Sequence, residues 1–167
     1  MSRVVEPDTA PSVVGASQQL LVLVPIRLAL GVGGLGAALA LSSRHGAIAL
    51  AFALGTFAAA VVLAADRRFA LRALEQPVPL PRDAHIVSLA EAAASGVLPS
   101  TVGVSVLAAI ALAVNRTLAG LLAGVVAGMG LAGLTAWYRV AAVERAGRAR
   151  LYVERGGRKR LFSTAAR

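Results

Sequence analysis

Long stretches without a charged residue are the feature that most limits how this chain can fold. Residues 47–65 form one such stretch of 19 residues, and residues 117–138 form another of 22. About 20 apolar residues of helix cover the hydrocarbon core of a bilayer, which is roughly 30 Å thick. A soluble globule of 167 residues could not enclose several such helices and still cover its own surface. The sequence therefore predicts an all-α integral membrane protein.

Four transmembrane helices are expected, at about residues 20–41, 47–65, 97–114 and 118–137. Short polar turns join the first to the second and the third to the fourth, which predicts two helical hairpins. Residues 1–19 are polar and contain two prolines, and we expect a disordered cytoplasmic lead there. Residues 66–96 would form a cytoplasmic connector, and residues 139–167 a basic cytoplasmic tail.

The connector and the tail each contain a further structural signal. Residues 84–96 are weakly amphipathic, which predicts a short interfacial helix lying on the membrane. The same residues could instead be the first turns of a longer third span, because Pro99 permits a break. In the tail, strand-like residues flank Gly156 and Gly157, which favours a small β-hairpin.

Basic residues are distributed unevenly between the two ends of these spans. With four spans, residues 1–19, the connector and the tail share one side, which carries fourteen basic residues, whereas the other side carries only Arg44 and Arg116. Segments rich in Lys and Arg stay on the cytoplasmic side of a membrane. We therefore expect a multi-pass protein of the cell membrane with its N- and C-termini in the cytoplasm.

Small residues recur every four positions along the second and fourth spans. The residues expected to pack are Ala51, Gly55 and Ala59 in the second span and Gly120, Gly124 and Gly128 in the fourth. Residues four apart share a helical face, and small side chains there let a neighbouring backbone approach closely. These faces indicate either packing within the bundle or an interface with a homo-oligomer or a larger membrane complex.

Arg27 is the one charged residue inside a predicted span. It lies seven residues after Leu20, which is about 10 Å into the membrane. An arginine at that depth can snorkel to the lipid headgroups, or it can serve a substrate or partner. The other spans offer no acidic residue that would clearly pair with it.

Other basic residues lie where the spans meet the cytoplasm. Those expected to contact anionic lipid headgroups are Arg67, Arg68, Arg139, Arg155, Arg158, Lys159 and Arg160. Trp137 and Tyr138 directly precede Arg139, which is typical of an aromatic belt at a membrane interface. We expect lipid as the partner of these charges, and a protein partner before nucleic acid, because a short basic run is nonspecific.

The sequence contains no recognisable catalytic, cofactor or metal motif. It has no cysteine, and no HExxH, GxSxG or phosphate-binding loop occurs. A lipid-modifying enzyme would need His85 and Glu91 brought together with Asp66 or Asp83. We therefore expect no catalytic site, no cofactor and no metal, and we do not expect an enzyme.

These features favour a small noncatalytic membrane protein, a scaffold or accessory subunit that acts through helix packing and contacts with lipid or protein. The alternative is a small transporter or channel, in which repeated hairpins enclose a path and Arg27 attracts an anion. A lipid-modifying enzyme is the third and weakest interpretation.

Overall fold

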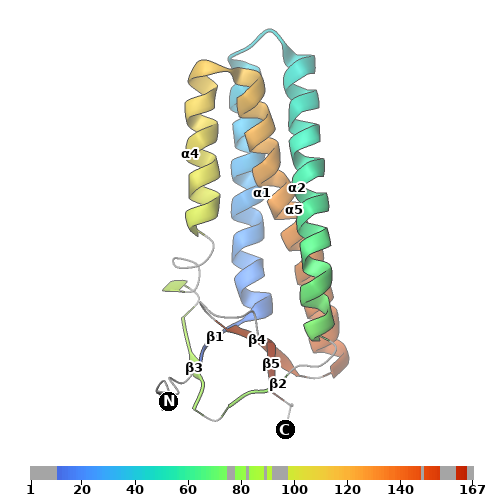
Figure 1. Ribbon diagram of the computed structural model, residues 1–167. Coiled ribbons are helices and arrows are strands. Elements are labelled where there is room, and N and C mark those ends of the chain that lie inside the picture. Colours follow the sequence, from blue (N-terminus) through green and yellow to red (C-terminus); the bar gives the residue numbers. More distant parts are fainter. Residues whose placement is uncertain are drawn as a thin grey trace, which may run out of the picture.

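The computed structural model describes residues 11–74, 78–81, 83–88, 90–91, 98–147, 149–154 and 161–164. Its long helices are α1 (Ala16–Ala40), α2 (His45–Leu74), α4 (Leu98–Val114) and α5 (Arg116–Gly147). They form an elongated bundle, with the start of α1 and the end of α5 at the same end of it (Figure 1). At that end lie five short strands, β1 (Ser12–Gly15), β2 (Val78–Pro79), β3 (His85–Ile86), β4 (Arg150–Glu154) and β5 (Leu161–Thr164).

Three of the helices are long and apolar enough to cross a membrane. They are Ala16–Ala40, the His45–Ala65 part of α2, and Arg116–Gly147. The apolar helix Ser100–Val114 is shorter, with fewer than 18 residues. The prediction of a helical protein with membrane-capable helices is therefore confirmed at this level.

The turns at the far end of the bundle are short because side chains cap them. A single residue, Asn115, separates α4 from α5, and its Oδ1 accepts hydrogen bonds from the backbone N–H groups of Thr117 (3.0 Å) and Leu118 (3.2 Å). Between α1 and α2, the Ser42 hydroxyl accepts a bond of 3.1 Å from the backbone N–H of Arg44. Such caps satisfy donors that a helix start leaves unpaired.

Helix α5 is the centre of the bundle, and its glycines face the backbone of α2. A Cβ added at Gly124 would collide with the carbonyl oxygen of Phe52, and one at Gly128 with the carbonyl oxygen of Thr56. One turn earlier, Gly120 lies against Ile48 in the same way. Three carbonyls spaced four residues apart thus lie along three glycines with the same spacing. When two helix backbones approach this closely, van der Waals contact and weak Cα–H···O bonds form between them. In lipid, where helices are not driven together by the hydrophobic effect, such contacts hold helices together.

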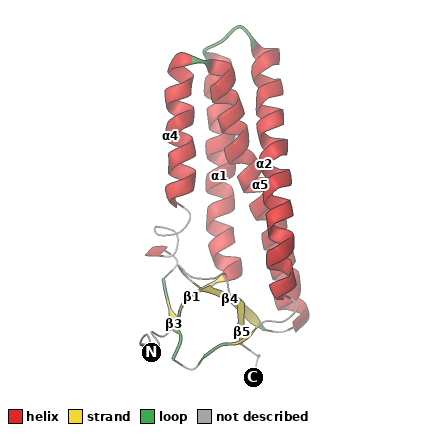
Figure 2. Cartoon of the chain, viewed as in Figure 1, coloured by secondary structure: helices red, strands yellow, loops and turns green. Residues whose placement is uncertain are grey.

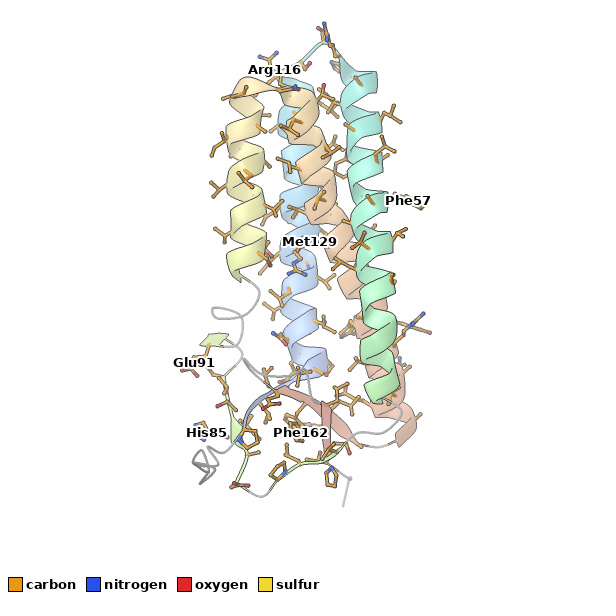
Figure 3. All side chains as sticks on the ribbon, in the orientation of Figure 1. Phe57, His85, Glu91, Arg116, Met129 and Phe162 are labelled. Atoms are coloured by element: carbon orange, nitrogen blue, oxygen red, sulfur yellow. The ribbon has the colours of Figure 1, made fainter. Side chains whose placement is uncertain are left out.

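A second small-residue face of α5 packs against α1. There Gly31 lies against Ala127, Gly34 lies against Ala123, and Gly133 lies against Val24. Helix α5 packs against α1 on one side and against α2 on the other. As a result, α1 and α2 contact each other little, although a short turn joins them. The large apolar side chains point the other way. Leu50, Leu54 and Phe57 of α2 are more than half exposed, and Figure 3 shows Phe57 projecting away from the bundle.

The five strands form one sheet in the order β2-β5-β4-β1-β3, and Figure 2 shows labelled strands of this sheet below the helices. β4 pairs antiparallel with both β1 and β5, while the edge strands β3 and β2 pair parallel with β1 and β5. The hairpin expected around Gly156 and Gly157 is thus present as β4 and β5. Its partners come from the segment before α1 and from the connector, which the sequence did not predict.

The sheet is attached to the bundle by a small apolar core. Leu151 of β4 is buried against Ala16 at the start of α1 and Val140 near the end of α5, and Leu20 and Val153 pack beside them. The carboxylate of Glu144 accepts a hydrogen bond of 2.9 Å from the backbone N–H of Leu151, linking α5 to β4. These contacts hold strand β4, and with it the sheet, against α1 and α5.

The predicted lead and interfacial helix are wrong in part. Residues 12–19 are not disordered: Val13 and Val14 are buried in β1, and α1 begins at Ala16, because the tail supplies β4 as a pairing partner. Within residues 84–96, His85–Ile86 is a strand instead of a helix. The Ser88 hydroxyl then accepts from the backbone N–H of Glu91, a helix-capping contact. Residues 92–97 of that prediction, and residues 1–10 of the lead, lie outside the described residues.

The α2–α5 contact makes a direct prediction about Gly124. Gly124→Ala should lower the midpoint of thermal unfolding in detergent, because the Phe52 carbonyl is backbone and the helices must separate, at a cost of about 1–3 kcal/mol. The control is Gly36→Ala, since an added Cβ there meets no atom within 4 Å. Alanine at that control site should leave the midpoint unchanged or raise it. Equal midpoints for both variants, measured by circular dichroism, would contradict this packing.

Candidate functional site

Arg27 is buried between helices, and it forms the centre of the candidate site. Its side chain is 7% exposed, and its Nε donates a hydrogen bond of 3.0 Å to the hydroxyl of Thr101 on α4. Thr101 is itself 1% exposed. On the other side, a Cβ added at Gly130 of α5 would lie 3.3 Å from the Cβ of Arg27, so the glycine leaves room for the arginine stem. The Arg27 side chain of α1 thus contacts α4 through its Nε and lies beside α5 at its Cβ.

A second hydroxyl lies one turn along α4. Ser105 follows Thr101 by four residues and so shares its helical face. Its Oγ is buried and has no hydrogen-bond partner in the part of the chain that the structure describes. An unsatisfied polar atom in an apolar setting costs free energy unless a partner arrives. The Arg27–Thr101 pair and the buried Ser105 hydroxyl bring polar groups into the apolar bundle, and a guanidinium there is chemically suited to hold an anion or a carboxylate.

This geometry differs from an arginine that snorkels outward from the bundle. A lipid-facing Arg27 would be exposed along its stem, whereas here the side chain turns toward α4 and α5. The sequence identified Arg27 as anomalous but not Thr101 as its partner. Hydroxyl residues are common in membrane helices, and only the rotation of α4 brings this one to face α1.

The residues predicted to pack lie together in the structure. Gly55, Gly120, Gly124 and Gly128 lie where α2 meets α5, and Ala59 touches the position that a Cβ of Gly128 would occupy. Ala51 is buried on the same side of α2. The structure thus places these small faces against each other within one chain.

The basic residues predicted to contact lipid are placed in part. Arg139 is exposed on α5 directly after Trp137 and Tyr138. Arg67 and Arg68 belong to the last third of α2, and their side chains lie outside the described part of the structure. Arg155, Arg158, Lys159 and Arg160 fall outside the described residues altogether.

The residues that a lipid-modifying enzyme would need lie near the sheet. His85 is exposed on β3, and Glu91 is exposed and accepts a bond of 3.3 Å from the Ser88 hydroxyl. Figure 3 shows both side chains at the sheet end of the molecule. Asp83 is exposed in a turn, and the side chain of Asp66 is not described. Over the described ranges, no three His, Asp or Glu side chains come close enough to hold a metal ion.

Comparison of the chain with protein-family models, curated proteins and solved structures finds no match.

The Arg27 site makes a prediction through its two hydroxyls. Thr101→Val removes the acceptor of the Arg27 Nε at nearly constant shape, and should destabilise the bundle by about 1–3 kcal/mol. Ser105→Ala is the matched control, because it removes a buried hydroxyl that bonds to no described residue, and it should be neutral or stabilising. Unfolding midpoints in detergent separate the two. An equal loss of stability in both variants would contradict the special role of Thr101.

Proposed function

We propose that this chain is a noncatalytic multi-pass membrane protein, a scaffold or accessory subunit whose four helices span the cell membrane and whose sheet faces the cytoplasm. The observation that carries the proposal is that segments from three distant parts of the chain join in one sheet fixed to one end of an apolar bundle. A platform of this kind presents a defined surface to a partner at the membrane.

The arrangement of large and small side chains supports placement in a bilayer. In α2, the side facing α5 carries Ile48, Ala51 and Gly55, while Leu54 and Phe57 are exposed on the opposite side. A soluble bundle buries its large side chains, whereas lipid solvates them. The described α4 has 17 residues, about 25 Å of helix, and a bilayer accommodates a slightly short span by thinning locally.

The charge distribution supports the orientation. Arg44 and Arg116 belong to the end of the bundle opposite the sheet, where Figure 3 shows Arg116. The sheet end carries Arg139, Arg145 and Arg150 among its described residues. Under the positive-inside rule, the sheet end is the cytoplasmic one.

Introduced cysteines test this topology, because the chain has none of its own. Ser43 in the turn between α1 and α2 and Asp83 in the connector are both exposed. A membrane-impermeant maleimide should label Ser43→Cys in intact cells, and should label Asp83→Cys only after permeabilisation. The parent chain, which has no cysteine and should not react with the maleimide, is the control. Labelling of both variants in intact cells would overturn the proposed topology.

The second candidate function is an anion transporter or channel, and the buried Arg27 favours it. A buried guanidinium of α1 that donates a hydrogen bond to Thr101 of α4 would serve as a binding site for an anion that crosses the membrane. The close packing of α5 against α1 and α2 argues for the scaffold instead, because the centre of the bundle is filled by a helix.

Reconstitution distinguishes the two functions. If the protein is a scaffold, it should be purified from cells in a complex of fixed stoichiometry. Reconstituted alone in liposomes, it should cause no more anion efflux than protein-free vesicles show. Transport would instead give efflux that Arg27→Gln abolishes and that Arg116→Gln, which changes an exposed arginine at the far end, leaves intact. Efflux that depends on Arg27, together with the absence of a co-purified partner, would overturn the scaffold proposal in favour of transport.

A further inference from the structure

A cavity of about 810 Å³ opens where the bundle meets the sheet. Its walls come from the first turns of α1, the last turns of α5, and the ends of β4 and β5. Ser17 and Ala141 of its lining each follow a residue of the small core formed by Ala16, Val140 and Leu151. The cavity therefore lies directly beside the contact that fixes the sheet to the helices, and Figure 1 shows both helix ends meeting the strands there.

The cavity straddles the boundary between the apolar span and the polar end of the molecule. Trp137 lines it near the end of the 22-residue uncharged stretch at residues 117–138, and Leu21 lines it at the start of the apolar part of α1. Arg145 lies eight residues beyond Trp137, about 12 Å along the helix. The headgroup layer of one leaflet is about 5–8 Å thick, so the lining reaches across it. Tryptophan is the residue that favours this depth.

Two arginines supply positive charge to the polar side of the cavity. The Nε of Arg145 donates a hydrogen bond of 3.0 Å to the backbone carbonyl of Ala141, one turn earlier, which directs the side chain back toward the membrane. Arg150 lines the cavity from the start of β4. Across the part of the chain that the structure describes, neither arginine forms an ion pair with a carboxylate.

One carboxylate also lines the cavity, and its role is accounted for. Glu144 accepts a hydrogen bond from the backbone N–H of Leu151 at 2.9 Å, which joins α5 to β4. The lining thus carries two guanidinium groups against one carboxylate, one oxygen of which accepts the Leu151 N–H. Gln18 adds an amide that can donate to a phosphate or to a headgroup hydroxyl.

We propose that this cavity binds the phosphate-bearing headgroup of an anionic membrane lipid. Arg145 and Arg150 contact the phosphate, for which the planar guanidinium group is well suited. The acyl chains leave between Leu21 and Trp137 into the bilayer, and the volume falls in the range of small-molecule sites. The bound lipid joins α1, α5 and β4, and so holds the sheet against the membrane. This inference rests on the membrane placement proposed above.

The only tryptophan of the chain is Trp137, so its fluorescence reports on this cavity alone. The full chain is reconstituted at about 0.15 M salt, where exposed charges beyond about 8 Å are screened. The vesicles are phosphatidylcholine with a small fraction of brominated phosphatidylglycerol, or with the same fraction of brominated phosphatidylcholine. Bromine quenches the fluorescence of a nearby tryptophan, so preferential quenching by phosphatidylglycerol measures selective binding. We expect this preference in the native chain.

Variants assign the preference to the cavity. Arg145→Gln and Arg150→Gln should each lower the relative affinity for phosphatidylglycerol by about fivefold, since each removes one basic residue near the surface. Arg116→Gln is the control, because Arg116 is exposed at the end of the bundle opposite the sheet and does not line the cavity. It should keep the preference within about twofold. Replacing both cavity arginines by lysine should restore part of the preference, because the charges return without the planar geometry.

The outcomes separate the proposals. No preference in the native chain, or an equal loss in Arg116→Gln, overturns the headgroup site. If inorganic phosphate at millimolar concentration abolishes the preference, the cavity takes the free anion and the lipid assignment is wrong. Quenching by brominated phosphatidylcholine alone shows that Trp137 lies in the bilayer, so membrane placement survives while the lipid site fails. If neither brominated lipid quenches, membrane placement fails and the lipid site fails with it.

Discussion

Close contact between the backbone of α5 and the backbones of its neighbours is the constraint on which the bundle depends. Gly120, Gly124 and Gly128 receive the carbonyls of α2, while Ala123 and Ala127 receive the glycines of α1. Lipid surrounds large side chains as favourably as protein does, so a membrane bundle gains stability from the tightness of such contacts. Because α5 occupies the centre, its ends determine where the polar parts attach, and Val140 and Glu144 near its end bind the sheet.

The sequence predicted membrane spans, and the helices of the structure extend beyond two of them. The second span was expected to end at residue 65 and the fourth at residue 137, whereas α2 continues to Leu74 and α5 to Gly147. Charged residues such as Asp66 end the part of a helix that lies in lipid, but they do not end the helix itself, because Asp and Arg are tolerated in water-exposed helices. Hydropathy therefore locates a membrane boundary, and capping residues locate a helix boundary.

The sheet shows where reading a sequence locally fails. The β4–β5 hairpin could be anticipated, because Gly156 and Gly157 separate two strand-like runs. β1 pairs with residues about 140 positions away, and β2 and β3 have two residues each, too few to show any alternation. Ser88 and Glu91, three residues apart, do carry a local signal for a helix start, and that signal places the start after β3 instead of at residue 84.

The candidate site was likewise predicted only in part, because local sequence identifies a residue but not its distant partner. Arg27 could be found from the sequence, because a charge within an apolar stretch is visible at once, but a search for its partner among carboxylates could not find Thr101. A hydroxyl does not neutralise a guanidinium; it replaces one of the hydrogen bonds that water would make. The bond from Arg27 to Thr101 therefore links α1 to α4 within the bundle, where both residues are buried. The cavity beside the sheet differs in kind, since Arg145 and Arg150 are exposed there, and in the proposed lipid site they hold an anion by geometry as well as by charge.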